Sequence, residues 1–558
     1  MNLKNKPEKN ILICLMALMV VEAVYYVLRI QYGMVEIDEQ FYLAIWKRFC
    51  VGDRFLLDEW NTAQFFSVLM APILKLYLAI VPTSDGIFIA FRIMYVLCHI
   101  LVGGLITLTL KDRLGYGALL VNVIYVMHTP FNLTTFSYYA SGNGILVILI
   151  CVILLKIKNK TADCLLKGIL TAYLVCCNPY CAILYIFQLC YFIYGLIRKK
   201  NSALREVLLF HVGILIPVVI FLVMFYRFDN PVELAKDVYH NLQGIFTEAA
   251  GDTKGVLAFL NPLIDHLKEF YWYSVSLLLV FIVGCVDKKR RFLYYPAIIV
   301  ISSAMAVFFM IHNDWLSGNI FPALICVVGA VSYFWNPDAD GKLFRSCYLM
   351  PLGYALCVYY ASNNGVTILQ SCTVGASITS VIFIYEYCNN AFDTTKSTKW
   401  TSIAFLSIVI IAEIVVKCSW THWDGAISEM NARITEGPAK GVITSQAKKD
   451  CYEAYVNDVK SINAGSEDTV LFYRNYCDGY LMTDARYGSR SPFVYEDPEY
   501  PTGKMQHYYE LHPDRVPNII YADSITIAQM GEEYWEEYGQ ANGYALSKCD
   551  SGAMILRK

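Results

Sequence analysis

Charged residues are scarce in this chain. Only 16% of its 558 residues are Asp, Glu, Lys or Arg, whereas 57% are hydrophobic, and the mean hydropathy is +0.44. A soluble domain carries roughly 25% charged residues. The composition therefore excludes an ordinary soluble protein and indicates a chain that lies mostly in lipid.

Other features are also missing. The 47 acids and 45 bases nearly cancel, so no basic excess indicates nucleic acid as a partner. The 19 cysteines show no CxxC pairs, which argues against a metal site or a disulfide framework. Repeats, low-complexity segments and matching pairs of broken helices are absent. No small-residue cleavage site follows the first apolar run, so we expect a retained anchor.

Long apolar runs are what the chain does contain. Fourteen of them approach the length of about 20 residues that spans a bilayer, and they cover 11–30, 62–81, 87–110, 115–131, 142–157, 168–178, 181–197, 207–226, 270–286, 292–311, 316–335, 346–361, 366–388 and 400–418.

Lysine and arginine in short loops mark the cytoplasmic side of a membrane protein. From Lys111 onward these loops alternate with the runs. If all of the first three runs crossed, the loop at Lys111 and Arg113 would fall outside. Polar or small residues recur at helical spacing along 62–81, and Pro72 lies among them, so we expect this run to lie in the interface. The alternative is that it spans and the loop violates the rule.

This reasoning predicts an α-helical polytopic membrane domain over 1–419, with about thirteen transmembrane helices, a cytoplasmic N-terminus and a first outer loop over 31–86. After Trp420 the sequence becomes polar. Short apolar stretches at 468–474, 517–523 and 552–558 resemble strands, and 444–462 resembles a helix. We expect an extracytoplasmic α/β domain over 420–558, in which two of Cys451, Cys477 and Cys549 could pair.

The first outer loop opens with an unusual acidic cluster. The stretch "MVEIDEQFYLAIWKRF" places Glu36, Asp38 and Glu39 directly after the first apolar run. Arg92 lies about one and a half turns into a later run, where a buried arginine costs a few kcal/mol unless something compensates it. Guanidinium groups bind phosphate oxygens with two parallel hydrogen bonds, so a lipid phosphate is a natural partner. The alternative is that Arg92 snorkels to the interface.

These residues suggest sugar transfer outside the cytoplasm, where nucleotide sugars are absent and the donor must be a sugar on a polyprenyl phosphate. The reaction needs a carboxylate that takes a proton from the acceptor hydroxyl, and cations that balance the departing phosphate. Asp38 with Glu36 or Glu39 fits the first role, and Arg92, with Lys75 as a weaker candidate, fits the second. Further candidates for the acceptor or sugar pocket are Gln64, Tyr138, Tyr139, Asn143, His312, Asp314 and Trp315.

At "EIDE" (36–39) the sequence resembles the C-type membrane glycosyltransferases, the GT-C superfamily, which includes protein O-mannosyltransferases and bacterial aminoarabinose transferases. The resemblance implies transfer from a polyprenyl-phosphate sugar to a glycan, lipid or protein at the bacterial plasma membrane, with the first-loop Asp as base. Several members carry another acid in the second outer loop, where this chain has Ser137, Tyr138, Tyr139 and Asn143, so a need for Mg²⁺ or Mn²⁺ stays open. The WWD-type motif of oligosaccharyltransferases is absent.

Three other functions compete with this interpretation. A transporter or flippase would place paired ionisable residues deep in its helices, and Glu22, Glu386 and Glu413 lie in or near apolar runs. A glycan polymerase or ligase would share the topology and the chemistry but use lipid-linked oligosaccharides. A membrane scaffold without catalysis would leave the acidic cluster as ordinary solvated loop residues.

Overall fold

The computed structural model describes residues 5–34, 38–197, 203–225, 231–250, 256–314, 316–362, 364–390, 396–473, 477–493 and 504–558. The α-helices are α1 (Asn5–Arg29), α2 (Asp38–Cys50), α3 (Ser67–Ile80), α4 (Ile87–Leu114), α5 (Gly117–Met127), α6 (Tyr138–Leu155), α7 (Lys160–Cys177), α8 (Ala182–Ile197), α9 (Ala203–Phe225), α10 (Pro231–Ala250), α11 (Val256–Glu269), α12 (Tyr271–Val286), α13 (Arg291–His312), α14 (Phe321–Trp335), α15 (Gly341–Leu343), α16 (Met350–Ala361), α17 (Gly365–Ser371), α18 (Val374–Asn390), α19 (Lys396–Ser419), α20 (Gln446–Ile462), α21 (Lys504–Leu511), α22 (Ser524–Met530) and α23 (Glu532–Asn542).

Shorter helical turns connect them: η1 (Thr62–Phe66), η2 (Pro130–Asn132), η3 (Pro179–Cys181), η4 (Lys288–Arg290), η5 (Ser317–Ile320), the π-helical η6 (Phe344–Leu349), η7 (Ile427–Glu429), η8 (Cys477–Leu481) and η9 (Pro513–Arg515). The strands are β1 (Trp420–Thr421), β2 (Gly425–Ala426), β3 (Ala432–Arg433), β4 (Ile443–Thr444), β5 (Thr469–Tyr473), β6 (Arg486–Tyr487), β7 (Ile519–Ala522), β8 (Ala545–Lys548) and β9 (Met554–Arg557).

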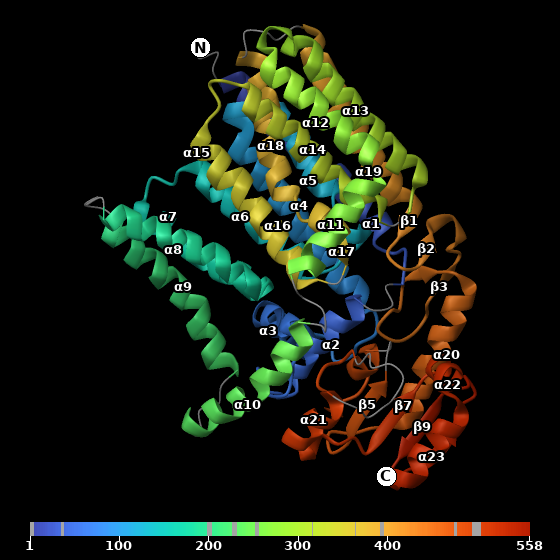
Figure 1. Cartoon of the computed structure of the whole chain (residues 1–558). Coiled ribbons are helices and arrows are strands. Elements are labelled where there is room, and N and C mark those ends of the chain that lie inside the picture. Colours follow the sequence, from blue (N-terminus) through green and yellow to red (C-terminus); the bar gives the residue numbers. More distant parts are fainter. Residues whose placement is uncertain are drawn as a thin grey trace.

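The long helices form a bundle whose two ends differ (Figure 1). The N-terminus lies at one end, and the C-terminal domain lies at the other with α2 and α3. Among the described residues, eight helices are long and apolar enough to cross a membrane, or up to ten if each of two bent pairs counts as one span. The polytopic helical class predicted from the sequence is confirmed, whereas the count of thirteen stays a prediction.

The run predicted to lie in the interface forms η1 and α3. It is one of the segments long and apolar enough to span. However, α3 packs on α2 and η1, and in Figure 1 both α2 and α3 lie at the end of the bundle near the C-terminal domain. This arrangement is the one expected for an interfacial helix of the first outer loop.

The C-terminal domain is built on a five-stranded mixed sheet with the order β6-β5-β7-β9-β8. β5 is parallel to β6 and β7, whereas β9 is antiparallel to β7 and β8. The predicted strands correspond to β5, β7 and β9, and the predicted helix corresponds to α20. Cys451, Cys477 and Cys549 form no disulfide in the described part of the chain, so the possible pairing of two of them is not seen.

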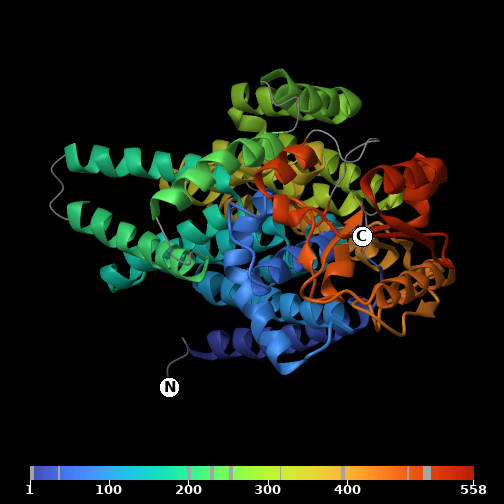
Figure 2. The same cartoon turned by 90° about the horizontal axis from the view of Figure 1, so that it is seen from below.

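The first outer loop and the C-terminal domain share one apolar core. Trp46 of α2 and Phe91 of α4 belong to the same buried cluster as Val456 and Phe472 of the C-terminal domain. Seen from below in Figure 2, the blue first-loop helices lie beside the orange and red domain, and α2 packs against η8. The loop is therefore sandwiched between the bundle and the domain.

A buried charge network reinforces this contact. Arg48 donates from Nε to Oδ2 of Asp53 (2.6 Å), from Nη1 to Oε2 of Glu59 (3.0 Å) and from Nη2 to the carbonyl of Ser489 (2.7 Å). Arg515 of the C-terminal domain binds Asp53 from the other side at 2.8 Å. Because Arg48, Asp53 and Glu59 are almost fully buried, these charged residues of the first loop serve to dock the domain.

We expect this docking to depend on pH through Glu59. Burial raises the pKa of its carboxyl from 4.5 to about 7, although Arg48 opposes the rise. A folded-state pKa above the unfolded value stabilises the fold at low pH, and this contribution is lost as pH rises from about 4.5 to about 7. The unfolding temperature in detergent should thus decrease as the pH is raised from 5 to 8. The decrease should be smaller in Glu59→Gln. Burial raises the pKa of Asp53 and Asp478 too, so part of the slope should persist. An equal slope in both proteins would contradict the assignment to Glu59.

Candidate functional site

The acidic cluster lies at the start of α2. Asp38 and Glu39 occupy the first turn of this helix, where carboxylates interact favourably with the positive end of the helix dipole. Glu36 lies outside the described residues. The two described acids differ in their surroundings, because successive residues of a helix point in different directions.

Glu39 forms a buried ion pair with Arg92 of α4. Nε and Nη2 of Arg92 donate to the two carboxylate oxygens of Glu39 at 2.9 and 2.6 Å. The same guanidinium donates to the carbonyls of Ile30 and Gly33, each at 2.8 Å. Neither charged side chain reaches solvent beyond 2% of its surface. The pair therefore ties the first outer loop to the ends of α1 and α4, and this placement favours a structural role for Glu39.

Asp38 has a different environment. Its side chain is 28% exposed, and its Oδ2 lies 2.8 Å from Nε2 of His422. No hydrogen bond to Oδ1 is found among the described residues. Asp38 is thus a carboxylate that is anchored through Oδ2 and partly exposed, as a general base requires.

Aromatic rings surround this carboxylate. The ring centroid of Tyr42 lies 6.3 Å from that of Tyr138, which lies 5.1 Å from that of Tyr139. Phe131 contacts Tyr139 at 5.5 Å and His422 at 6.2 Å between centroids. Burial, together with Tyr139 and the charge of Asp38, raises the pKa of the Tyr42 phenol well above its ordinary value. The second outer loop therefore meets the first near Asp38, and the role of Tyr138 and Tyr139 in a sugar or acceptor pocket stays a prediction.

The backbone of the second outer loop is strained beside His422. Phe131 and Asn132 both adopt left-handed conformations, with φ values of 56° and 58°. Such conformations cost about 1–3 kcal/mol for residues other than glycine and persist only where contacts hold them. Here the amide of Phe131 donates to Asn319 of η5 at 2.8 Å, and the side chain of Asn132 donates to the carbonyl of Trp420 at 2.5 Å. Three outer segments thus converge at this turn.

Two further cations are buried near the acidic site. Arg29, at the end of α1, donates to the carbonyls of Lys417 and Trp420 at 2.8 and 2.7 Å. Lys417, near the end of α19, donates to the carbonyl of Met127 at 2.6 Å and to Thr129 at 2.5 Å. The hydrogen-bond acceptors found for both side chains are neutral oxygens, and Glu413 lies close enough to Lys417 to offset part of its charge. Such groups create a positive potential in a site of low dielectric.

The other predicted site residues do not join this group through any contact found in the structure. Gln64 is buried and braces the first loop through Leu56 and Glu59. Asp314 accepts hydrogen bonds from the start of η5. Three candidates remain. Lys75 is an exposed residue of α3, His312 is an exposed residue at the end of α13, and Asn143 is a buried residue of α6. Trp315 lies outside the described residues.

Sequence reasoning missed His422, Arg29 and Lys417. Each lies within a few residues of the outer end of an apolar run, which is the signal that drew attention to Arg92. A single arginine or lysine at such a position is typical of snorkelling, so only the packed structure separates these residues from ordinary interfacial cations.

The structure also shows the surroundings of the three acids that would favour a transporter. Glu386 pairs with Arg113 at 2.5 Å, and Glu413 lies 3.4 Å from Nδ1 of His128. Both oxygens of Glu22 are buried without a hydrogen bond among the described residues. These acids do not form a common site in any contact found here.

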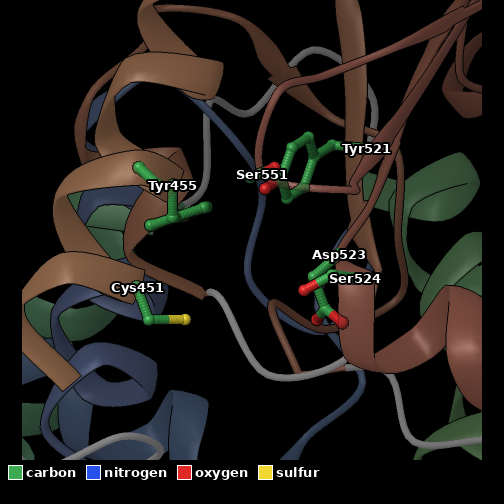
Figure 3. A pocket seen from close by; sticks show the side chains of 7 residues that line it. Cys451, Tyr455, Tyr521, Asp523, Ser524 and Ser551 are labelled. Carbon is green, nitrogen blue, oxygen red and sulfur yellow. The ribbon is translucent and has the colours of Figure 1, made fainter. Parts of the chain in front are cut away.

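Two cavities lie away from Asp38. One of about 70 Å³ in the C-terminal domain is lined by Cys451, Tyr455, Tyr521, Asp523, Ser524 and Ser551, with α20 on one side and the sheet region on the other (Figure 3). It has room for a few water molecules. The other, of about 300 Å³, is mostly apolar and lies between α7, α8 and α9. Over the described part of the chain, no cluster of three or more His, Cys, Asp or Glu could hold a metal ion.

No protein-family model matches this chain, and no curated protein matches its sequence. Among solved structures, ArnT from Cupriavidus metallidurans in the apo state shares 10% identity over 98% of both chains, with a TM-score of 0.47. The chain is similar in overall arrangement to ArnT. A second ArnT structure, bound to undecaprenyl phosphate, shares 10% identity over 98% of this chain and 97% of the other, with a TM-score of 0.45. ArnT is an aminoarabinose transferase with the GT-C fold. At this distance the likeness assigns neither residues nor substrates to this chain.

Proposed function

We propose that this protein is a membrane glycosyltransferase that moves a sugar from a polyprenyl-phosphate donor to an extracytoplasmic acceptor, with Asp38 as the general base. The observation that carries the proposal is the division of labour between adjacent acids. Glu39 is fully buried in a bidentate pair with Arg92, whereas Asp38 is held through Oδ2 and its side chain is 28% exposed. Ordinary solvated loop acids would not be fixed in this way.

The reaction assigned to this site is a single displacement. The acceptor oxygen attacks the anomeric carbon of the sugar while Asp38 Oδ1 takes the hydroxyl proton. The bond between that carbon and the phosphate oxygen breaks, and its electron pair leaves with the polyprenyl phosphate. The leaving group needs no proton, so one base suffices, and the configuration at the anomeric carbon is inverted.

Positive charge behind Asp38 would favour this step. Arg29 and Lys417 are fixed by carbonyl and hydroxyl oxygens, and Arg92 is fixed by Glu39. Cations held in place before the reaction stabilise charge that develops on a departing phosphate without reorganisation. Arg92 acts in this proposal through its position, since its donors are already occupied and Glu39 balances its charge. The proposal routes no step through a divalent metal.

Donor consumption tests the proposal. Purified protein in membranes is incubated with a panel of radiolabelled polyprenyl-phosphate sugars. The wild type and the Asp38→Asn variant are tested in parallel with each donor. We expect one donor to be consumed by the wild type and spared by the variant. Consumption of only pyrophosphate-linked oligosaccharides would instead identify a polymerase or ligase. Movement of intact lipid across the membrane without consumption would identify a flippase.

The proposal requires the first loop and the C-terminal domain to lie outside the cytoplasm. A membrane-impermeant thiol reagent applied to intact cells should label Pro82→Cys and Glu467→Cys, and should label Asp112→Cys only after permeabilisation. All three positions are exposed in the structure, so accessibility depends on the side of the membrane. The three cysteine variants are made in a protein in which Cys418 and Cys451, which are also exposed, are each replaced by Ser. Labelling at 112 with protection at 82 would show that 62–81 spans.

A further inference from the structure

The partners of His422 restrict its protonation. Nδ1 lies 3.2 Å from the carbonyl of Phe131, and Nε2 lies 2.8 Å from Oδ2 of Asp38. A carbonyl can only accept a hydrogen bond, so Nδ1 must carry a proton. With Asp38 ionised, Nε2 must donate as well, and the ring carries a proton on each nitrogen. Neither nitrogen is then available to accept a proton from a substrate.

We propose that His422 is the positioning residue of the base. Its imidazolium holds Oδ2 of Asp38 and directs Oδ1 toward the acceptor hydroxyl. This inference rests on the proposed function and adds to it a residue contributed by the C-terminal part of the chain. His422 does not itself take the proton, because both of its ring nitrogens face acceptors.

The turn that carries His422 is built to hold it. It connects β1 and β2, two-residue strands that pair antiparallel at the start of the C-terminal domain. Trp423 adopts a left-handed conformation with a φ of 56° at the tip. Gly33 lies so close to this hairpin that a Cβ would come within 2.6 Å of Thr421, and its φ is 92°. The hairpin is therefore packed directly against the chain that leads into the acidic cluster.

The same turn binds both Met34 and Asp38. The carboxylate of Asp424 accepts the amide of Met34 at 2.6 Å, while His422 binds Asp38. Asp424 is itself fixed by Thr444 at 2.8 Å and by Lys448 at 3.1 Å. Two residues of one turn thus hold Met34 and Asp38, and these contacts set the position of Asp38 relative to the bundle.

The charged and titratable groups found around His422 in the described part of the chain come from α2, α6 and its own turn. Asp38 from α2 faces Nε2, and the phenols of Tyr42, Tyr138 and Tyr139 lie around that carboxylate on α2 and α6. Asp424 is turned toward Met34 and Lys448. Removing the imidazolium should therefore act chiefly on Asp38.

The test compares His422→Gln with His240→Gln, a matched change at an exposed histidine of α10. Gln retains a donor near Asp38 but carries no charge. We expect His422→Gln to lower kcat by about ten- to a hundredfold, the range typical of residues that orient a catalytic group. The acidic limb of its pH–rate profile should move to higher pH, the KM for the donor should stay within about twofold, and His240→Gln should behave as wild type.

A double-mutant cycle separates positioning from general stability. If His422 acts through Asp38, adding His422→Gln to Asp38→Asn should cost little further activity, because coupled residues are not additive. Full additivity, or an unmoved acidic limb, would overturn the inference. Failure of the proposed function would look different, since Asp38→Asn alone would then keep its activity. The thermal unfolding midpoint of each variant, measured in detergent, shows whether activity is lost through unfolding. His422→Lys restores a charged donor, so it should return the acidic limb of the pH–rate profile toward its wild-type position.

Discussion

Replacing Asp38 by Asn is expected to lower the turnover of sugar transfer by about 10²–10⁴-fold, the usual contribution of a general base. Asn preserves the shape of the side chain and can still meet His422, but it cannot take a proton from the acceptor. Because Asp38 is partly exposed and outside the shared core, expression and thermal stability should stay near those of the wild type. Donor binding should also change little, so the loss should appear in kcat.

Asp265→Asn is the matched control for this experiment. Asp265 lies on α11, and its side chain is 68% exposed beside Lys268. The same chemical change there should leave turnover unaffected. If Asp38→Asn keeps near-normal transfer with an identified donor, the base lies elsewhere, and Glu36 would be the next acid of the cluster to substitute.

Replacing Arg92 by Met is expected to destabilise the protein rather than only slow it. The substitution leaves the carboxylate of Glu39 buried without its partner, which typically costs about 3–5 kcal/mol. The carbonyls of Ile30 and Gly33 lose donors as well. We expect a lower yield of folded protein and a lower unfolding midpoint in detergent, and Glu39→Gln in the same chain should restore part of the stability by removing the unpaired charge.

Arg113→Met provides the control for Arg92→Met. Arg113 also pairs with a glutamate, but its side chain is 36% exposed, so solvent screens the pair. Loss of such a pair costs about 0–1 kcal/mol. A stable Arg92→Met protein with a strongly raised KM for the lipid donor would instead support direct binding of the donor phosphate by Arg92.

The helical architecture follows from local sequence properties. Apolar runs of spanning length must satisfy their backbone hydrogen bonds internally in lipid, so helices are the expected structure at α4, α13 and α19. The change at Trp420 is equally local, because α19 ends at Ser419 and β1 begins at Trp420. The strands β5, β7 and β9 were predictable because each is a short apolar stretch bounded by polar residues.

The roles within the acidic cluster were not predictable in the same way. Asp38 and Glu39 are adjacent acids of similar chemistry in the first turn of one helix, and the sequence offered both as the base. Their difference arises because Glu39 faces Arg92 of α4, whereas Asp38 faces His422. Local sequence contains no information on which partner each side chain will meet.

The sequence by itself determined that this protein is a polytopic helical chain with a polar C-terminal region and an acidic cluster that follows its first helix. Those features depend on hydrophobicity and spacing, which are properties of neighbouring residues. Only the tertiary structure decided that Glu39 is neutralised, that Asp38 stays partly exposed, and that His422, 384 residues away, binds it. These outcomes depend on which distant segments pack together, because burial and partners set the chemistry of a carboxylate.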